Sequence, residues 1–138
     1  MKPIPNTQKP LIFRTDFSSQ VAWQEICAAI QEPVGDFLAY VEFFEDAEFA
    51  NVTKDQLLVL IPKNYNHTFI VIVDRTCVLQ PDHPLLVVDL FTEFGREFRA
   101  IPSMVQSIEN NLSIANMDFE EFASAVDQNG VFRGFLGS

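Results

Sequence analysis

The chain has 138 residues, enough for one domain with a buried core, and 48% of them are hydrophobic, including 14 phenylalanines. This composition excludes a disordered chain, which combines low hydrophobicity with high charge. The formal net charge of −10 argues against nucleic acid or an anionic membrane as a partner, because both would repel the protein. It favours a cation or a basic protein partner.

We expect a single domain over residues 1–138, with residues 1–10 as an irregular N-terminal arm and residues 136–138 as an expression scar. The arm lacks the apolar core of a signal peptide, and the longest apolar runs, FIVIV and PLLVV, are too short to span a bilayer. Cys27 and Cys77 form no CxxC motif, so we expect two buried free thiols. These features predict a cytoplasmic monomer.

The chain opens with a strand and a helix. LIFRTDF (11–17) is rich in residues that favour strands, and it is followed by Ser18 and Ser19, which can cap a helix. Apolar residues then recur at helical spacing until Pro33 and Gly35 end the helix.

A second strand and a short helix follow. FLAYVEF (37–43) predicts a strand that runs directly into an acidic segment. Thr53 with Gln56 three residues later forms a capping box, which predicts a helix in KDQLLVLI (54–61) that Pro62 terminates.

Three further strands are predicted in the middle of the chain. TFIVIVD (68–74) is almost continuously apolar, which is typical of a strand buried on both faces. LLVVDLF (85–91) follows a QPDHP turn, and Gly95 lets the chain reverse into EFRAI (97–101). We expect these last strands to form antiparallel hairpins.

The C-terminal third is predicted to form two helices. The first should begin at a capping box of Ser103 and Gln106, and the second at a capping box of Asp118 and Glu121 that Asn129-Gly130 would stop. One apolar stripe should line the first helix: Met104, Val105, Ile108 and Leu112. The order of elements predicts an α/β fold with α+β character, in which helices pack on a single mixed sheet of about five strands.

Carboxylates follow each of the first three predicted strands. If right-handed crossovers make these strands parallel, their carboxyl ends share the edge of the sheet where ligands bind. Clustered carboxylates raise one another's pKa unless a cation neutralises them, and Ca²⁺ accepts six to eight such oxygens. The candidate ligands are Asp16, Glu42, Glu45, Asp46, Glu48 and Asp74.

Within this set Glu45, Asp46 and Glu48 are the preferred ligands, because they lie in a segment that can wrap an ion. Glu42 is still on the predicted strand, and Asp16 and Asp74 depend on the expected topology. The alternative is that these acids form a solvated face above buried phenylalanines. No EF-hand loop can be aligned, because the required glycine and final glutamate are absent from the candidate positions.

A second oxygen-rich region follows the first C-terminal helix. It contains Asn110, Asn111, Asn116 and Asp118, of which Asp118 is explained by helix capping and the amides are suitable ligands for a hard cation. No zinc-ligand spacing, nucleophile motif or phosphate-binding loop occurs, so we do not expect an enzyme.

The segments LIFRTDF, DFLAYVEFFEDAEFA, HPLLVVDLF and SIENNLSIANMDFEEFASAV resemble a family of small bacterial domains of uncharacterised function. In size, acidity and lack of an EF-hand the chain is also similar to the CcbP type of cyanobacterial calcium-binding proteins, which are calcium buffers linked to heterocyst differentiation. The second resemblance implies sequestration of cytosolic Ca²⁺ by non-EF-hand sites.

Two functions therefore remain open. The first is a cytoplasmic calcium-binding protein, either a buffer or a sensor for signalling, with its site in the acidic segment after the second strand. The second is an acidic interaction module without metal, which docks a basic protein partner through its negative face.

Overall fold

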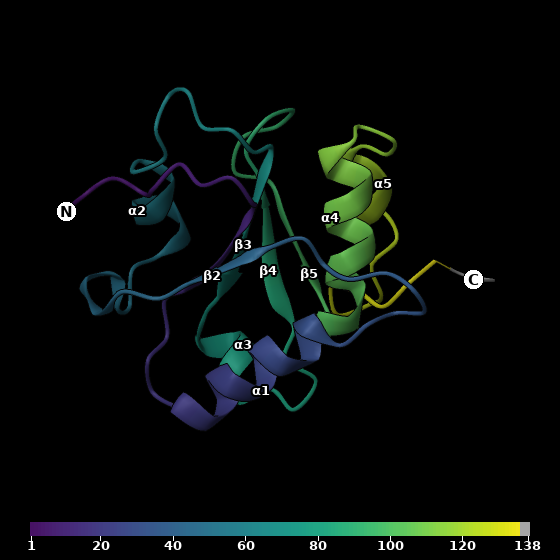
Figure 1. Ribbon diagram of the computed structural model, residues 1–138, viewed down its shortest axis with the longest axis horizontal. Coiled ribbons are helices and arrows are strands. Elements are labelled where there is room, and N and C mark those ends of the chain that lie inside the picture. Colours follow the sequence, from purple (N-terminus) through teal and green to yellow (C-terminus); the bar gives the residue numbers. More distant parts are fainter. Residues whose placement is uncertain (136–138) are drawn as a thin grey trace.

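The computed structural model describes residues 1–135, so the scar predicted at residues 136–138 lies outside the described part. Its centre is a six-stranded mixed sheet in the order β2-β1-β3-β4-β5-β6, with helices on both faces (Figure 1). This confirms the predicted α/β class and the single mixed sheet. No helix in the described range combines the length and the apolar character needed to cross a bilayer.

The first half of the sheet is parallel, as predicted. β1 (Leu11–Arg14) lies between β2 (Glu42–Phe44) and β3 (Phe69–Val73), and both neighbours run parallel to it. All residues of β1 and β3 are buried, because helices and loops cover both faces of these strands. The carboxyl ends of the three strands therefore meet at one edge.

The second half begins with the predicted antiparallel hairpin. β4 (Leu85–Asp89) pairs antiparallel with both β3 and β5 (Glu97–Ala100). A sixth strand, β6 (Val131–Phe132), was not expected and pairs parallel with β5. Two residues are too few for a pattern of strand periodicity, so only the tertiary contact reveals it.

Helices on one face enclose the larger core. α1 (Gln20–Gln31), α3 (Arg75–Leu79), α4 (Val105–Ser113) and α5 (Phe119–Ala123) each contribute buried side chains to it. As predicted, α1 starts at Ser19, whose side chain accepts the Ala22 N–H. The buried positions of α4 include three residues of the predicted stripe: Val105, Ile108 and Leu112.

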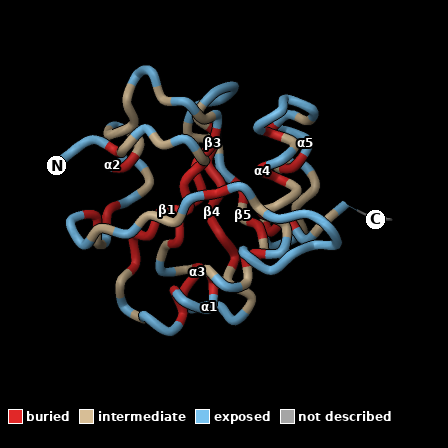
Figure 2. Tube along the Cα trace, viewed as in Figure 1, coloured by how far each residue is buried: buried red, intermediate tan, exposed pale blue. Residues whose placement is uncertain are grey.

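A smaller core on the other face lies under α2 (Lys54–Leu58), a 3-10 helix (η1, Ala47–Phe49) and the N-terminal arm. Figure 1 shows α2 and the arm on the side of the sheet opposite α4 and α5. The arm has no helix or strand, yet Ile4 is 1% exposed and its N–H donates to the Leu60 carbonyl. Figure 2 shows that buried segments concentrate in the central strands.

The second strand is shorter than predicted. We expected residues 37–43, whereas β2 contains only Glu42–Phe44. Its partner β1 begins at Leu11, which is opposite Glu42, so the residues before Glu42 have no strand to pair with. Strand propensity alone cannot show this limit.

Two predictions of where helices begin or end are also wrong. Ser103 caps no helix, because a 3-10 helix (η2, Pro102–Met104) already includes it and leads directly into α4. Gly130 does not stop α5, which ends at Ala123; it lies at φ 79° in a turn that leads to β6. The capping boxes at Thr53 and Asp118 are confirmed.

Candidate functional site

The carboxyl ends of β1 and β3 form a small polar cavity of about 230 Å³. The chain leaves β1 for its neighbour β2 on one side and returns as β3 on the other, which makes this the topological switch point of the sheet. Two of the six predicted ligands, Asp16 and Asp74, line the cavity. The predicted parallel topology is therefore confirmed at these two strand ends.

Asp16 and Asp74 are both engaged in bonds within the protein. Asp16 is 3% exposed; its Oδ1 accepts the N–H and the hydroxyl of Ser18 at 3.0 and 2.5 Å, and its Oδ2 lies 3.9 Å from the Arg75 guanidinium. Asp74 caps α3, a helix that sequence reasoning missed, and accepts two hydrogen bonds from Arg99 at 2.9 and 2.7 Å. The cavity is therefore a site of balanced charge.

Three other predicted ligands, Glu45, Asp46 and Glu48, lie in the segment after β2, and each has a cationic or backbone partner. Asp46 caps η1 and forms an ion pair with Lys2 at 2.5 Å, while Glu48 accepts the backbone N–H of Lys2. Glu45 lies 3.5 Å from the buried guanidinium of Arg14. The hydrogen bond from Lys2 holds the pKa of Asp46 below its ordinary value.

Glu42 is exposed on β2, as the sequence left open. Over residues 1–135 no group of three or more His, Cys, Asp or Glu side chains comes close enough to hold a metal ion. Two of the six predicted acids thus line the switch-point cavity, three follow β2, and Glu42 lies on the strand itself. Intramolecular cations or N–H groups bind five of the six: Asp16, Glu45, Asp46, Glu48 and Asp74.

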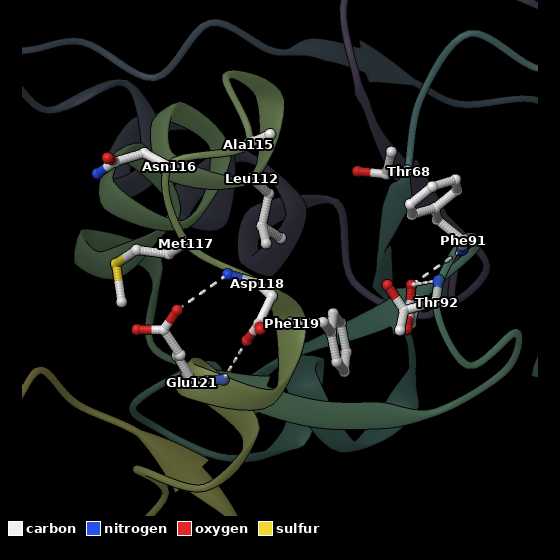
Figure 3. Close-up of a pocket in the computed structure, with 11 residues that line it drawn as sticks. Thr68, Phe91, Thr92, Leu112, Ala115, Asn116, Met117, Asp118, Phe119 and Glu121 are labelled. Carbon is white, nitrogen blue, oxygen red and sulfur yellow. Dashed lines mark hydrogen bonds between the residues drawn. The ribbon is translucent and has the colours of Figure 1, made fainter.

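A second hollow, of about 290 Å³, lies between the α4–α5 connection and the loop that joins β4 to β5 (Figure 3). It is at the opposite end of the sheet from the switch point, because β4 runs antiparallel to β3. Eleven described residues line it: Thr68, Asp89, Phe91, Thr92, Leu112, Ala115, Asn116, Met117, Asp118, Phe119 and Glu121. We call this hollow the α4–α5 cavity.

One wall of the cavity is the tight connection between α4 and α5. Ala115 adopts a left-handed conformation at φ 56°, and the Asn116 amide donates to the Asn111 side chain at 2.8 Å. The Asp118 carboxylate and the Glu121 N–H, together with the reverse bond, then form the capping box that starts α5. These bonds hold the wall in place without any ligand.

The opposite wall depends on the buried carboxylate of Asp89. It accepts the backbone N–H groups of Phe91, Thr92 and Glu93 at 2.9, 3.3 and 2.8 Å, and its side chain is nearly inaccessible at 2% exposure. Gly95, at φ 93°, closes the same loop by donating to the Asp89 carbonyl. This arrangement projects Phe91, which is 77% exposed.

The α4–α5 cavity combines apolar walls with carboxylates that no cationic side chain of the lining neutralises. Figure 3 shows Leu112 and Phe119 on one side and Phe91 on the other. Three of the eleven lining residues are acids (Asp89, Asp118 and Glu121), and none of the eleven is Lys, Arg or His. The nearby Arg96 is already paired with Glu93 and Glu120, and the hydrogen bond that its guanidinium donates to the Glu120 carboxylate raises its pKa.

Two carboxylate oxygens at the cavity remain available. Asp118 and Glu121 each use one oxygen in the capping box, and the second oxygen of each has no partner within residues 1–135. An apolar hollow with free carboxylate oxygens fits a group that has an aliphatic stem and a cationic head, such as a lysine or arginine side chain. Phe91 adds an exposed ring for a cation–π contact.

Only part of this cavity was predicted from the sequence. Asn116 and Asp118 belong to the second oxygen-rich region that was singled out, but Asp89, Phe91 and Phe119 were not considered as site residues. The sequence does contain an indication that Asp89 has a special role, because it is the only acid in the apolar run LLVVDLF and it precedes a loop. The amides of Asn111 and Asn116, which were considered as cation ligands, bond to each other instead.

Comparison with curated proteins finds no match for this sequence. A model of a family described as a domain of unknown function (DUF6924) matches residues 9–135. The match covers most of the chain, and it agrees with the resemblance to uncharacterised domains. The protein therefore belongs to this family.

Proposed function

We propose that the protein is an acidic binding module that docks a basic partner protein, with the α4–α5 cavity as the anchor site for a lysine or arginine side chain. One observation carries this proposal: the cavity has three carboxylates, apolar walls and no cation among its lining residues. The net charge of −10 would accelerate encounter with a basic partner.

The walls of the cavity also support this proposal, because they are already in place. Asp89 and the Asp118–Glu121 capping box organise the two loops in the free protein, so little ordering entropy is lost when a partner binds. Such a preformed hollow with an exposed aromatic rim is typical of a site that receives an anchor residue.

The experiment is an NMR titration with a defined basic peptide, a nine-residue chain of alternating lysine and leucine, and with its glutamate counterpart as a negative probe. We expect the methyl signals of Leu112 and Met117 to shift only with the lysine peptide. The variant Asp118→Asn/Glu121→Gln keeps groups that can cap α5 and removes two charges, so it should weaken binding about tenfold.

The matched control is Asp55→Asn/Glu32→Gln, which removes two charges from exposed positions outside the cavity. Its affinity for the peptide should stay within about twofold of the parent at physiological ionic strength, because exposed charges are screened over about 8 Å. Equal weakening by both double variants would show that only the overall charge matters, and it would overturn the assignment of the cavity.

Calcium binding in the cytoplasm, by a buffer or sensor of the CcbP type, is our second proposal. It is supported by the meeting of Asp16 and Asp74 at the switch-point cavity, where α/β sheets commonly bind ligands. The free thiols of Cys27 and Cys77 suit a reducing compartment. An ion that binds only the folded state adds about 2.7 kcal/mol at a hundredfold excess over its Kd.

Thermal unfolding in Ca²⁺, in Mg²⁺ and in chelator tests this second proposal. We expect Ca²⁺ alone to raise the Tm, because Mg²⁺ requires a tighter octahedral geometry and retains its water. The Asp16→Asn variant should lose the Ca²⁺ response. Identical unfolding curves in Ca²⁺ and chelator would exclude calcium as a ligand.

A further inference from the structure

A second contact surface lies at the β2 edge of the sheet, away from the α4–α5 cavity. Within residues 1–135 β2 pairs only with β1, so its other side has no strand partner. The Glu42 N–H donates to the Pro10 carbonyl at 2.9 Å, so the backbone N–H of Glu42 points toward the β1 side. Because successive residues of a strand alternate in direction, the N–H and C=O of Phe43 point away from β1.

The open strand is rigidly supported on both faces. Phe43 packs edge-on against Trp23 with ring centroids 6.3 Å apart, and Phe44 packs on Phe13 and Phe49 at 5.0 and 6.0 Å. These contacts hold the backbone in an extended conformation before any partner arrives. An edge that is already ordered loses little entropy when it accepts another strand.

The segment that leads into β2 exposes apolar side chains next to this edge. Phe37, Leu38 and Tyr40 lie within the four residues 37–40 and are 61%, 63% and 48% exposed, although they are large. Natural sheets usually protect an open edge with lysine, proline or a covering loop. Here Phe37 and Leu38 are exposed to the side chains of an added strand, whereas the Lys9 ammonium lies 4.9 Å from the centroid of the Tyr40 ring.

The negative charge near the β2 edge favours a basic segment as the added strand. Asp36 and Glu42 are exposed and have no ionic partner within the described part of the chain, and Glu45 is 48% exposed at the side chain. A second copy of the protein would bring these acids against their equivalents, which disfavours self-pairing. A basic extended segment would meet complementary charge.

We propose that β2 is a docking edge for an extended basic segment of a partner protein, which adds to the sheet as a seventh strand. The backbone hydrogen bonds would come from the outward groups of Phe43, and the lysine or arginine side chains would face Asp36, Glu42 and Glu45. This surface does not depend on the α4–α5 cavity, so either can fail without the other.

The test uses a seven-residue peptide of alternating lysine and threonine, together with the same peptide N-methylated at alternate residues. Both carry the same charge, but the methylated form cannot donate the backbone bonds along one edge. Hydrogen exchange by NMR should show that saturation with the first peptide slows the Phe43 amide at least tenfold. The Glu42 amide, which is already bonded to Pro10, should change little.

Three results would overturn the proposal: equal binding of the two peptides, an unprotected Phe43 amide at saturation, or shifts confined to the α4–α5 cavity. Formation of a dimer through β2 in sedimentation experiments would also overturn it, since the occupant would then be a second copy. The variant Asp36→Lys/Glu42→Lys should weaken the lysine–threonine peptide at least tenfold while leaving the titration of the α4–α5 cavity unchanged.

Discussion

The ion pair between Asp74 and Arg99 connects the switch-point cavity to the stability of the sheet. Two hydrogen bonds of 2.7 and 2.9 Å join the groups, whose side chains are only 26% and 21% exposed. The Arg99 guanidinium also donates to the Pro84 carbonyl at 2.9 Å, while Asp74 caps α3 through the Cys77 N–H. Removing either partner therefore leaves a half-buried charge uncompensated.

The size of the effect follows from these contacts. A hydrogen bond to a charged group contributes about 1.5–3 kcal/mol and an N-cap about 1 kcal/mol, so we expect Asp74→Ala to lower the free energy of unfolding by about 3 kcal/mol. Asp74→Asn keeps a capping group and should cost about 2 kcal/mol. Arg99→Met keeps the aliphatic stem and should cost about 2 kcal/mol.

A double-mutant cycle measured by urea unfolding isolates the pair. For Asp74→Asn combined with Arg99→Met, we expect a coupling energy of about 1.5 kcal/mol, with unchanged m-values. A coupling below about 0.5 kcal/mol would mean that solvent screens the pair as it does at an exposed surface, and it would refute the reasoning.

Three further outcomes are expected. Ile4→Ala in the N-terminal arm should lower the free energy of unfolding by about 3 kcal/mol in urea, because Ile4 is fully buried, whereas Val59→Ala at an 81% exposed position should change it by less than about 0.5 kcal/mol. Burial raises the pKa of the Cys27 thiol to about 11, so alkylation by iodoacetamide at pH 8 should be much slower in the folded protein than in urea. As the pH rises, the Cys27 thiol loses its proton in the unfolded state before it does so in the folded state. The contribution of Cys27 to stability should therefore fall as the pH rises from about 9 toward 11. The hydrogen bond from Arg133, with backbone N–H groups, holds the pKa of Asp127 below its ordinary value of 3.8. As the pH falls, the unfolded state binds this proton first, so the contribution of Asp127 to stability is present above about pH 4 and is lost at lower pH. NMR titration of the Asp127 carboxyl should show the lowered midpoint in the parent and its return toward 3.8 in Arg133→Gln.

Local sequence patterns predicted much of the fold, where short-range physics decides the outcome. The apolar run of β3, the Ser19 cap of α1 and the capping boxes at Thr53 and Asp118 all rest on residues within a few positions of one another. The parallel arrangement of the first three strands was also predicted, because right-handed crossovers permit little else.

The candidate sites were predicted less well, since they depend on contacts between distant residues. Asp16 and Asp74 do share a cavity, but no local sequence pattern indicates that Arg75 pairs with Asp16 and Arg99 with Asp74. The α4–α5 cavity joins Phe91 to Phe119, which are 28 positions apart in the sequence. Rules based on residue spacing apply only to near neighbours in the sequence, so they cannot predict this contact.

By itself, the sequence determined the acidity, the apolar content and the helix starts, because these are properties of composition and of near neighbours. Only the tertiary structure decided which carboxylates found a cation and which remained free. It also decided that β2 forms an edge of the sheet, since no other strand among residues 1–135 pairs with its outer side. The physical reason is that charge pairing and strand order depend on the packing of segments far apart in the chain.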